Sequence, residues 1–284
     1  MTKCKKNPLV KPIVKWVGGK RQLLDEIRPF LNCHFSSYIE AFVGGGAVIF
    51  DLQPKKAIIN DFNEELINVY KVIKENPQEL IIELMHHKKM NSEEYFYRIR
   101  GLDRKNEYTN LSDIERAARI VYLNKTCYNG LYRVNSSGFF NSPYGKYKNP
   151  DIVNNTVIMA MSDYFNKNDI KIISGDYKDV LKKARKGSFV YLDPPYMPIS
   201  DTSAFTGYTE GGFNYQSQVE LRDECIKLHK KGVKFLQSNS YCDEIVDLYG
   251  SIEGFKIKIV KAKRSVNSKG NDRGEIDEVL IYNE

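Results

Sequence analysis

The sequence predicts an α/β fold, in which a mixed β-sheet carries helices on both faces. Three observations support this fold. Short apolar runs typical of strands alternate with helical stretches over residues 20–73, and the alternation returns over residues 170–249. Residues 255–260 and 278–282 then have the pattern of an antiparallel pair that closes the sheet.

The first part of the chain contains two repeats of helix and strand. Apolar side chains recur at helical spacing over residues 20–31 and 63–73. Residues 38–42 and 57–60 are short apolar runs, which predict strands, and residues 47–52 can form a helix behind a run of glycines. This order favours parallel strands covered by helices.

After residue 76 the pattern changes to helices alone. Helices are expected over residues 77–90, 92–102 and 112–124, followed by an aromatic, glycine-rich stretch at residues 126–150. We interpret this region as an inserted, mainly helical domain. The predicted organisation is an α/β domain in two parts, residues 1–76 and 166–284, with the insertion at residues 77–165.

The alternation resumes in the last part of the chain. The elements expected there are strands over residues 170–174, 188–192 and 233–237, helices over residues 177–185, 216–231 and 243–249, and a polar loop over residues 264–274.

Composition limits the class of protein. With 284 residues, 42% of them hydrophobic, the chain can bury a sizeable core. The net charge of +7 fits either general solubility or a polyanionic partner. No apolar run approaches the about 20 residues of a membrane span. The basic N-terminus lacks the apolar core of a signal peptide, so we expect a cytoplasmic protein.

Neither the cysteines nor the histidines predict a metal site. The five cysteines are scattered without a CxxC pair, which also argues against a disulfide framework. The adjacent His86 and His87 have no third ligand at a fitting spacing, and a solvated helix end is the favoured interpretation.

The tetrapeptide Asp193-Pro194-Pro195-Tyr196 follows the apolar run at residues 188–192. An acidic residue and two prolines after a buried strand give a rigid turn, with a carboxylate and a backbone carbonyl directed at one spot and an aromatic face beside them. This arrangement suits a flat ring that carries an amino group. The alternative is an ordinary surface turn.

Glycines between a predicted strand and helix suggest a nucleoside site. Gly44, Gly45 and Gly46 follow Phe42, and Asp61 ends the next strand, where it can accept hydrogen bonds from ribose hydroxyls. The pattern is not GxGxxG, so pyrophosphate binding is disfavoured. The alternative is a tight turn and an unrelated helix cap.

A second glycine pair lies in Trp16-Val17-Gly18-Gly19-Lys20. The Trp face and the Lys ammonium could hold the adenine and the carboxylate of an amino-acid-bearing nucleoside. The alternative is a loop with a buried Trp.

In this order, these motifs resemble the Dam family of DNA adenine-N6 methyltransferases, and most of all the GATC modification methylases of Dpn type. The likeness runs over residues 14–282 and includes residues 128–131 and 140–148. It implies a Rossmann-like methyltransferase fold that binds S-adenosyl-L-methionine. The implied cofactor residues are Trp16, Lys20, Phe42, Gly44, Gly45, Gly46, Asp61 and Asp193, with Asp176 a further candidate for the adenine end.

The sequence departs from the family at one position of the glycine motif. The family usually has an acid and a proline there, whereas Glu40 is followed here by Ala41. We expect a small effect on cofactor affinity.

The resemblance implies methyl transfer to N6 of adenine in double-stranded DNA, in GATC, after base flipping. The catalytic residues would be Asp193, Pro194, Pro195 and Tyr196. The Asp193 carboxylate and the Pro194 carbonyl would accept the amine N–H bonds, and Tyr196 would stack on the base or face the methylsulfonium. No metal is required.

Target recognition is expected in residues 126–148. Asn129-Gly130 between Cys127-Tyr128 and Leu131-Tyr132 predicts a β-hairpin, and basic residues interleaved with aromatics can grip DNA. Arg133 is expected to bind a guanine, whereas Phe139 and Phe140 should pack on the helices. The DNA-binding candidates are Lys15, Tyr128, Asn129, Leu131, Arg133, Pro143, Lys146, Tyr147, Arg264, Lys269 and Arg273.

Several of these roles come from the family. By resemblance, Lys15 and Tyr147 would read the first guanine, and Tyr128 and Asn129 would fill the space left by the flipped adenine. The basic residues of the loop at 264–274 would touch phosphates or simply be solvated.

The biological setting stays open at this point. The resemblance favours the modification half of a restriction-modification system, with a cognate restriction endonuclease encoded nearby and no stable complex between them. The alternatives are an orphan regulatory or repair methylase, an RNA adenine or DNA cytosine-N4 methyltransferase, and a DNA-binding module without catalysis.

Overall fold

The computed structural model describes residues 6–198, 212–263 and 275–284. Contacts divide the chain into two compact units. The first unit consists of Met1–Gly19, Val43–Lys55 and Asn63–Gly175, and the second of Lys20–Phe42, Lys56–Phe62 and Asp176–Glu284. The predicted insertion, residues 77–165, falls inside the longest segment of the first unit. Its role as a separate domain stays a prediction.

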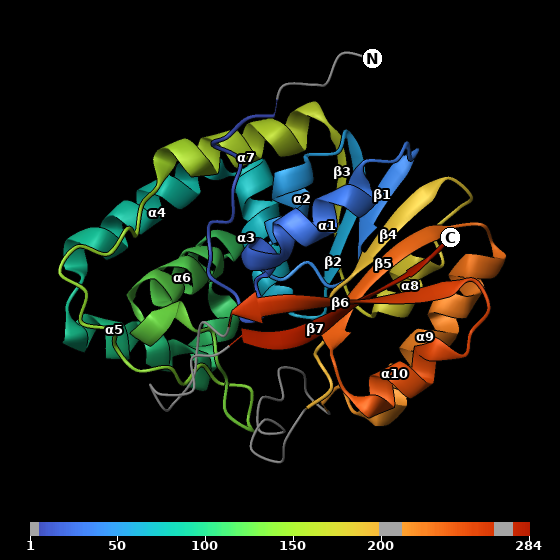
Figure 1. Ribbon diagram of the computed structural model, residues 1–284. Helices are drawn as coiled ribbons and strands as arrows, with labels where there is room; N and C mark the ends of the chain where they lie inside the picture. The colour runs from blue at the N-terminus through green and yellow to red at the C-terminus, as the bar shows by residue number, and fades with distance from the viewer. Residues whose placement is uncertain (1–5, 199–211, 264–274) are drawn as a thin grey trace. The chain divides into compact units, whose positions relative to one another are not determined.

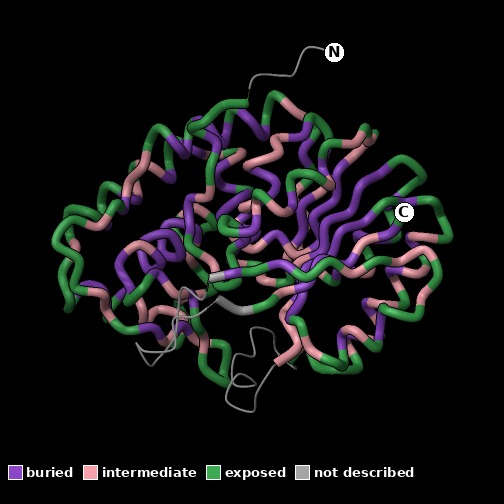
Figure 2. The backbone as a smooth tube through the Cα atoms, in the orientation of Figure 1, coloured by how far each residue is buried: buried purple, intermediate pink, exposed green. Residues whose placement is uncertain are grey.

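Six strands of the second unit pair side by side (Figures 1 and 2). Their order is β2-β1-β4-β5-β7-β6, parallel from β2 to β5 and antiparallel at β7 and β6. All of β4 is buried, because this central strand has neighbours on both sides. The strands are β1 (Ser37–Glu40), β2 (Lys56–Asp61), β4 (Ser188–Leu192), β5 (Lys234–Ser240), β6 (Phe255–Lys263) and β7 (Glu275–Asn283).

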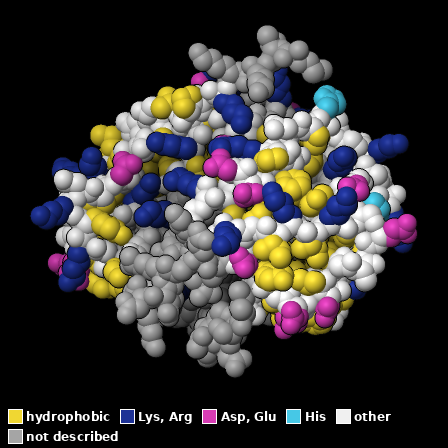
Figure 3. Space-filling model, in the orientation of Figure 1, with side chains coloured by type: hydrophobic (Ala, Val, Ile, Leu, Met, Phe, Trp, Pro, Cys, Tyr) yellow, Lys and Arg dark blue, Asp and Glu magenta, His cyan; other side chains and the backbone are white. Residues whose placement is uncertain are grey.

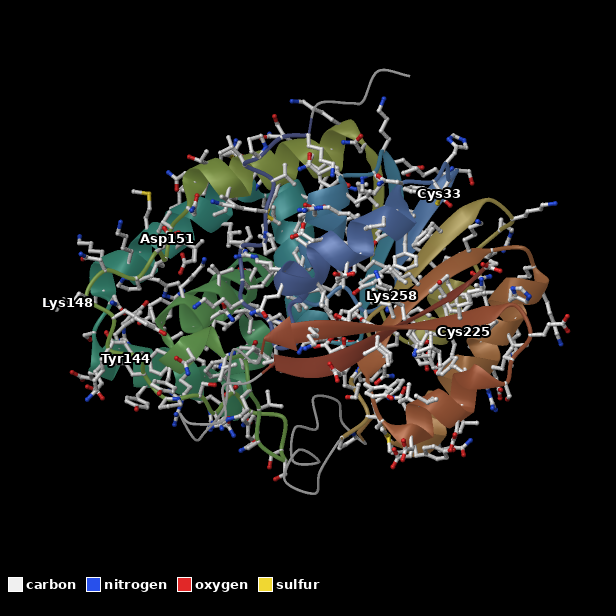
Figure 4. All side chains as sticks on the ribbon, viewed as in Figure 1. Cys33, Tyr144, Lys148, Asp151, Cys225 and Lys258 are labelled. Atoms are coloured by element: carbon white, nitrogen blue, oxygen red, sulfur yellow. The ribbon has the colours of Figure 1, made fainter. Side chains whose placement is uncertain are left out.

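Helices cover both faces of this sheet. The Phe30 ring of α1 packs on Tyr282 of β7, with ring centroids 4.7 Å apart. Tyr282 pairs with Leu236 of β5, so the next residue, Gln237, points to the opposite face. There Gln237 lies against Cys225 of α9 (labelled in Figure 4), at 3.4 Å. The predicted mixed sheet with helices on both faces is confirmed. The helical elements of this unit are the 3-10 turn η1 (Lys20–Leu23), α1 (Leu24–Leu31), α8 (Tyr177–Leu181), α9 (Tyr215–Lys230) and α10 (Asp243–Gly250).

The first unit is mainly helical. Three of its helices begin where the sequence predicts, because Asn63, Ser92 and Ser112 each accept a backbone N–H of the first turn. Ser112 also forms a reciprocal capping box with Glu115. Its elements are α2 (Ala47–Leu52), α3 (Glu64–Glu75), α4 (Pro77–Met90), α5 (Glu93–Arg100), α6 (Asp113–Thr126), α7 (Asn155–Lys167), β3 (Asp169–Ser174) and the 3-10 turns η2 (Gly101–Arg104), η3 (Asn106–Asn110) and η4 (Tyr128–Gly130).

The observed helices differ from the predicted ones at two places in particular. Helix α7 has no counterpart among the predicted helices. Helix α8 ends at Leu181 rather than residue 185, because the next turn tightens into bonds from the Lys183 and Ala184 amides to the Val180 and Leu181 carbonyls, both at 3.0 Å.

The predicted hairpin at Asn129-Gly130 is wrong in its pairing. The turn itself forms: Asn129 and Gly130 have φ of 58° and 65°, and the Leu131 amide donates to the Tyr128 carbonyl at 3.3 Å. The flanking residues pair elsewhere, since Cys127 bridges to Tyr144. A second antiparallel bridge, from Val134 to Phe140, encloses a turn at residues 135–138. A left-handed turn of this kind therefore does not by itself make the residues on its two sides pair with each other.

The prediction for the histidine pair is wrong for His87. His86 is exposed, but His87 is only 5% exposed and stacks on Tyr122 with centroids 4.8 Å apart. Its Nδ1 lies 2.7 Å from the Tyr95 hydroxyl. Burial, with a smaller contribution from His86, lowers the pKa of His87 to about 4. It is therefore a neutral core residue near neutral pH.

Candidate active site

The acidic turn begins where β4 ends, and its carboxylate is paired. The Lys20 ammonium lies 2.8 Å from Asp193 Oδ1, and the Ser238 hydroxyl donates to the same oxygen at 2.9 Å. The Lys20 and Asp193 side chains are 6% and 19% exposed, so the ion pair is largely shielded from solvent. Three elements that are distant in sequence, η1, β4 and β5, thus meet at one carboxylate.

Tyr196, at the other end of the turn, is held at its ring and at its hydroxyl. The Lys20 ammonium lies over the ring, 4.4 Å from the centroid. The hydroxyl donates to Glu278 Oε2 of β7 at 2.7 Å. The aromatic face predicted beside the carboxylate is present, and one cation touches both groups.

Buried amide and hydroxyl side chains fix the backbone of the turn. Gln218 of α9 donates to the Pro195 carbonyl at 2.9 Å, and Asn239 of β5 donates to Gln218 at 2.9 Å. Asn239 also accepts the Met197 amide at 3.1 Å. Among the described residues, the Pro194 carbonyl accepts no hydrogen bond. That carbonyl therefore keeps its capacity for an outside donor.

The charges of this cluster depend on its burial. Burial raises the pKa of the Asp193 carboxyl, and Lys20 and Ser238 oppose that rise. Burial also raises the pKa of Glu278. Burial, and then the charges of Asp193 and Glu278, hold the pKa of Tyr196 well above its usual value. The phenol therefore stays a donor, and Lys20 favours the ionised form of Asp193.

An aromatic cluster lies near the other predicted cofactor residues of the second unit. The Phe42 ring is 5.1 Å from Tyr177 and 6.0 Å from Phe213. Within the described residues, the buried Tyr177 hydroxyl has no hydrogen-bond partner. Asp176 precedes Tyr177 and caps α8 by accepting the Lys178 amide at 2.7 Å. Asp176 therefore has a local structural role, and its part in cofactor binding stays a prediction.

The strand ends beside Phe42 are also ordered by polar side chains. Glu40 is 2% exposed and accepts the Tyr38 hydroxyl at 2.8 Å. The Asn60 amide donates to the Ala41 carbonyl at 2.9 Å, and Asp61 follows at the half-buried end of β2. The bond from Asn60 restrains the turn at Ala41, where the family usually has proline.

In the first unit, the glycine motif packs against the Trp16 motif. A Cβ on Gly44 would lie 3.1 Å from Trp16 Cδ1, and one on Gly45 would lie 3.3 Å from Trp16 Cβ. The Trp16 ring stacks on Tyr132 at 4.6 Å. Gly46 has φ of 73°, and a Cβ there would meet the Phe50 ring at 2.4 Å. Packing alone thus requires glycine at 46, whatever its part in ligand binding.

The DNA-binding candidates Lys15, Tyr128, Asn129, Leu131 and Pro143 come together in the first unit. Asn124 accepts the Lys15 amide at 2.9 Å and donates to the Lys15 carbonyl at 2.7 Å and to the Gly130 carbonyl at 3.1 Å. The Tyr128 amide donates to the Pro143 carbonyl at 2.8 Å. Tyr128 itself is 57% exposed, so its ring is available to a partner.

The remaining candidates of this unit lie along the same segment. Arg133 is exposed and donates through Nε to Asn141 at 2.8 Å. Lys146, with φ of 53°, is exposed, and Tyr147 is 40% exposed. Phe140 is buried, as predicted, and Phe139 lies under the Arg104 guanidinium. Arg264, Lys269 and Arg273 lie outside the described residues.

A cavity is present elsewhere in the first unit. Its volume is about 720 Å³, and Asp151 (labelled in Figure 4) is on its wall. None of its lining residues belongs to the predicted sets. The lining residues are Met85, Lys88, Lys89, Asp151, Val153, Asn154, Asn155 and Thr156.

Comparison with known proteins decides the family. The model of the D12 class N6 adenine-specific DNA methyltransferases matches residues 16–266. The chain belongs to this family. As an adenine-N6 DNA methyltransferase it is 47% identical over 274 residues to the type II methyltransferase M1.LlaDCHI of Lactococcus lactis subsp. cremoris, covering 96% of this chain and 95% of that protein.

Other relatives of the methyltransferase carry two kinds of name. The type II methyltransferase M.MjaIII of Methanocaldococcus jannaschii is 43% identical over 292 residues, covering 96% of this chain and 99% of that protein. The DNA adenine methylase of Vibrio cholerae is 31% identical over 281 residues, covering 94% of each. The resemblance to the adenine methyltransferases is thereby confirmed over nearly the whole chain.

Sequence reasoning missed the side chains that support the methyltransferase's acidic turn. Gln218, Ser238 and Asn239 are 0% exposed, and two of them lie at the end of β5. A polar run directly after an apolar strand was an available signal, because buried polar groups need partners. Glu278 gave no such signal, since it directly precedes the apolar run at residues 279–282 and reads as the polar start of a strand.

Two further searches concern the described parts of the methyltransferase only. Within them, no group of three His, Cys, Asp or Glu side chains could hold a metal ion. None of the helices described there combines the length and the apolar character that crossing a membrane requires.

Proposed function

We propose that this methyltransferase transfers a methyl group from S-adenosyl-L-methionine to N6 of a flipped adenine in GATC. The buried turn from Asp193 to Tyr196 carries the proposal. It presents an ionised carboxylate, a backbone carbonyl with spare accepting capacity and an aromatic ring within one tetrapeptide. A planar nucleobase amine has two N–H donors and a π face, which match these groups.

The residues of the turn would make the amine a better nucleophile. The lone pair of an exocyclic amine is delocalised into the ring, so acceptors that direct its N–H bonds away from the ring plane localise that pair. Asp193 and the Pro194 carbonyl are the two acceptors. When bound, the cofactor would supply an activated methyl group, and its bond to sulfur would break as the bond to nitrogen forms. The product ammonium then releases its proton to Asp193 or to water.

Lys20 has a defined part in this scheme. It favours the ionised form of Asp193, and only an ionised carboxylate offers both oxygens as acceptors. Its ammonium covers one face of the Tyr196 ring. We infer that the target adenine stacks on the other face.

The second unit also has a site that fits the adenosine part of the cofactor. Phe42, Tyr177 and Phe213 form an aromatic cluster. No described residue bonds to the buried Tyr177 hydroxyl, and a purine nitrogen could accept its hydrogen bond. Asp61, at the end of β2, would accept the ribose hydroxyls. Trp16 and the glycines at 44–46, which pack on one another in the first unit, stay predicted cofactor residues.

DNA contact is assigned to exposed residues of the first unit. Lys15 lies against Gly130 of the turn that begins at Tyr128, and Arg133, Lys146 and Tyr147 follow along the chain. Figure 3 shows Lys and Arg side chains spread over the visible face, with Asp and Glu among them. The net charge of +7 supports a polyanionic partner, and phosphate contacts predict an affinity that falls steeply with salt.

We propose the modification half of a restriction-modification system as the biological role. The higher identity to relatives named type II methyltransferases supports this role over that of an orphan DNA adenine methylase. Under this proposal a cognate restriction endonuclease is encoded nearby. Deleting the methylase gene should then be lethal only while that endonuclease is active.

The sequence assignment is tested with matched duplexes. Purified protein is incubated with S-adenosyl-L-methionine and a duplex containing either GATC or the permuted site GTAC. Protection of GATC alone against a methylation-blocked nuclease, with N6-methyladenine in the digested product, is the expected result. Equal methylation of both duplexes would remove the GATC assignment. Methylated cytosine would favour a DNA cytosine-N4 methyltransferase, and methylated RNA would favour an RNA adenine methyltransferase. DNA binding without methyl transfer would favour a module that lacks catalysis.

A further inference from the structure

Glu278 has no part in the mechanism so far, yet it is bonded to the acidic turn. It lies on β7, where it pairs with Ser240 of β5 and Val260 of β6. Its Oε2 accepts the Tyr196 hydroxyl at 2.7 Å. Since β5 separates β7 from β4 in the sheet, this bond ties the turn to a strand that is not its neighbour.

The bond from Tyr196 to Glu278 restrains the orientation of the Tyr196 ring, which nothing else in the turn restrains in the same way. The prolines and the bonds to Gln218 and Asn239 fix the backbone. The Tyr196 ring can still swing about its side-chain torsions. The Lys20 ammonium attracts the face of the Tyr196 ring. A cation over the ring does not, however, prevent the ring from rotating within its own plane. The bond to a carboxylate at the hydroxyl supplies the second point of attachment.

We propose that Glu278 is a positioning residue for methyl transfer, which acts by fixing the Tyr196 ring against which the target adenine stacks. This role rests on the proposed function. Stacking sets the position of the amine relative to Asp193 and the methyl donor, and small displacements of reacting groups have large effects on rate. Glu278 bonds to the Tyr196 hydroxyl and leaves the ring faces free, so its effect would pass through Tyr196.

Holding the Tyr196 ring with Glu278 costs the folded protein some stability. Glu278 is partly buried, burial raises its pKa, and Lys20 counters only part of that effect. A carboxylate with a raised pKa destabilises the folded state at neutral pH.

Single-turnover kinetics of the full-length protein test this role. The substrates are saturating S-adenosyl-L-methionine and a GATC duplex, and the variants are Glu278→Ala, Glu278→Gln, Tyr196→Phe and Glu278→Ala with Tyr196→Phe. Glu26→Ala is the matched control, since Glu26 pairs with Lys258 (labelled in Figure 4) at an exposed site of the same unit. Duplex affinity and melting temperature are measured for each variant.

The proposal predicts a specific pattern of rates. Glu278→Ala and Tyr196→Phe should each lower the methyl-transfer rate constant by about tenfold, and the double variant by no more than either alone, because residues that act as a unit are not additive. Glu278→Gln should keep most of the rate, because its amide oxygen accepts the hydroxyl, and should melt no lower than the wild type. Duplex affinity and the Glu26→Ala control should stay unchanged.

Other outcomes separate this proposal from the function on which it rests. If the wild type makes N6-methyladenine but Glu278→Ala keeps its rate, or if the two losses multiply in the double variant, Glu278 has no positioning role. A rate that falls only in proportion to unfolded protein would show a structural role instead. If the wild type methylates no adenine, the proposed function fails and the positioning role with it.

Discussion

Replacing Lys20 with methionine should destabilise the protein, and the loss should depend on pH. Methionine keeps most of the length and apolar volume of lysine but removes the charge that faces Asp193. Because the two side chains are only 6% and 19% exposed, the pair counts as buried. Breaking a buried pair at one partner costs about 3–5 kcal/mol, since the other charge remains without compensation. We expect about 3 kcal/mol, because Ser238 still donates to Asp193.

The sign of the pH dependence follows from the Asp193 carboxyl. Burial already raises its pKa, and removing Lys20 takes away the largest opposing effect. A carboxyl whose pKa is higher in the folded state than in the unfolded state stabilises the protein when it is protonated. This stability is fully present below the unfolded pKa of about 4, and it is lost as the pH rises through the folded pKa. The free-energy loss caused by Lys20→Met should therefore be larger at pH 8 than at pH 5.

Urea unfolding at pH 5 and pH 8 measures both effects. Lys258→Met is the control, since Lys258 pairs with Glu26 at a site where both side chains are more than 40% exposed and should contribute at most about 1 kcal/mol. Adding Asp193→Asn to Lys20→Met should restore much of the loss at pH 8, because the uncompensated charge is gone. A Lys20→Met protein that is as stable as the wild type, or that loses the same free energy at both pH values, would refute the reasoning.

Three further predictions follow from the first unit. The pKa of His87 is lowered to about 4, against an unfolded value of about 6.5, so the unfolded state binds the proton first as the pH falls. The free energy of unfolding should therefore fall by up to about 3 kcal/mol from pH 7 to pH 4. A fall of the same size in His87→Gln would contradict this. Gly46→Ala should cost about 1–3 kcal/mol in chemical unfolding, because alanine would meet the Phe50 ring at a φ of 73°, and unchanged stability would show that the ring yields. Arg133→Ala should reduce discrimination between GATC and sites with a changed guanine by about 1–3 kcal/mol in methylation competition, whereas equal loss on all sites would indicate a phosphate contact.

The sequence predicted best what local chemistry decides. Asn63, Ser92 and Ser112 cap helices whose starts were expected at or next to them. The left-handed turn at Asn129 and Gly130 also formed. Its flanks did not pair, because the Tyr128 amide donates to the Pro143 carbonyl and Cys127 bridges to Tyr144. Pairing of this kind is a tertiary property that a turn motif cannot reveal.

His87 shows a signal that was present but not used. Leu80, Leu84 and His87 are spaced along one face of α4, and all three are buried. The neighbouring lysines and His86 instead favoured an exposed end. Helical spacing from the apolar residues would have placed His87 inside and His86 outside.

The acidic turn itself was readable, but its supports were not. The motif from Asp193 to Tyr196 predicted the chemistry, because few tetrapeptides combine an acid, two prolines and an aromatic ring. The sequence also suggested Lys20 as a cofactor ligand, and the structure adds a direct pair with Asp193. The bond from Tyr196 to Glu278 joins residues 82 positions apart, a distance over which no periodicity carries information.

The most direct test of the acidic turn is the nucleoside that an Asp193→Asn variant releases from a GATC duplex. Asparagine keeps the shape of the side chain but loses the charge and one acceptor. We predict N6-methyladenine from the wild type and none above background from Asp193→Asn, at equal affinity for the duplex. N6-methyladenine formed by Asp193→Asn at the wild-type rate would contradict the assignment of the amine to this carboxylate.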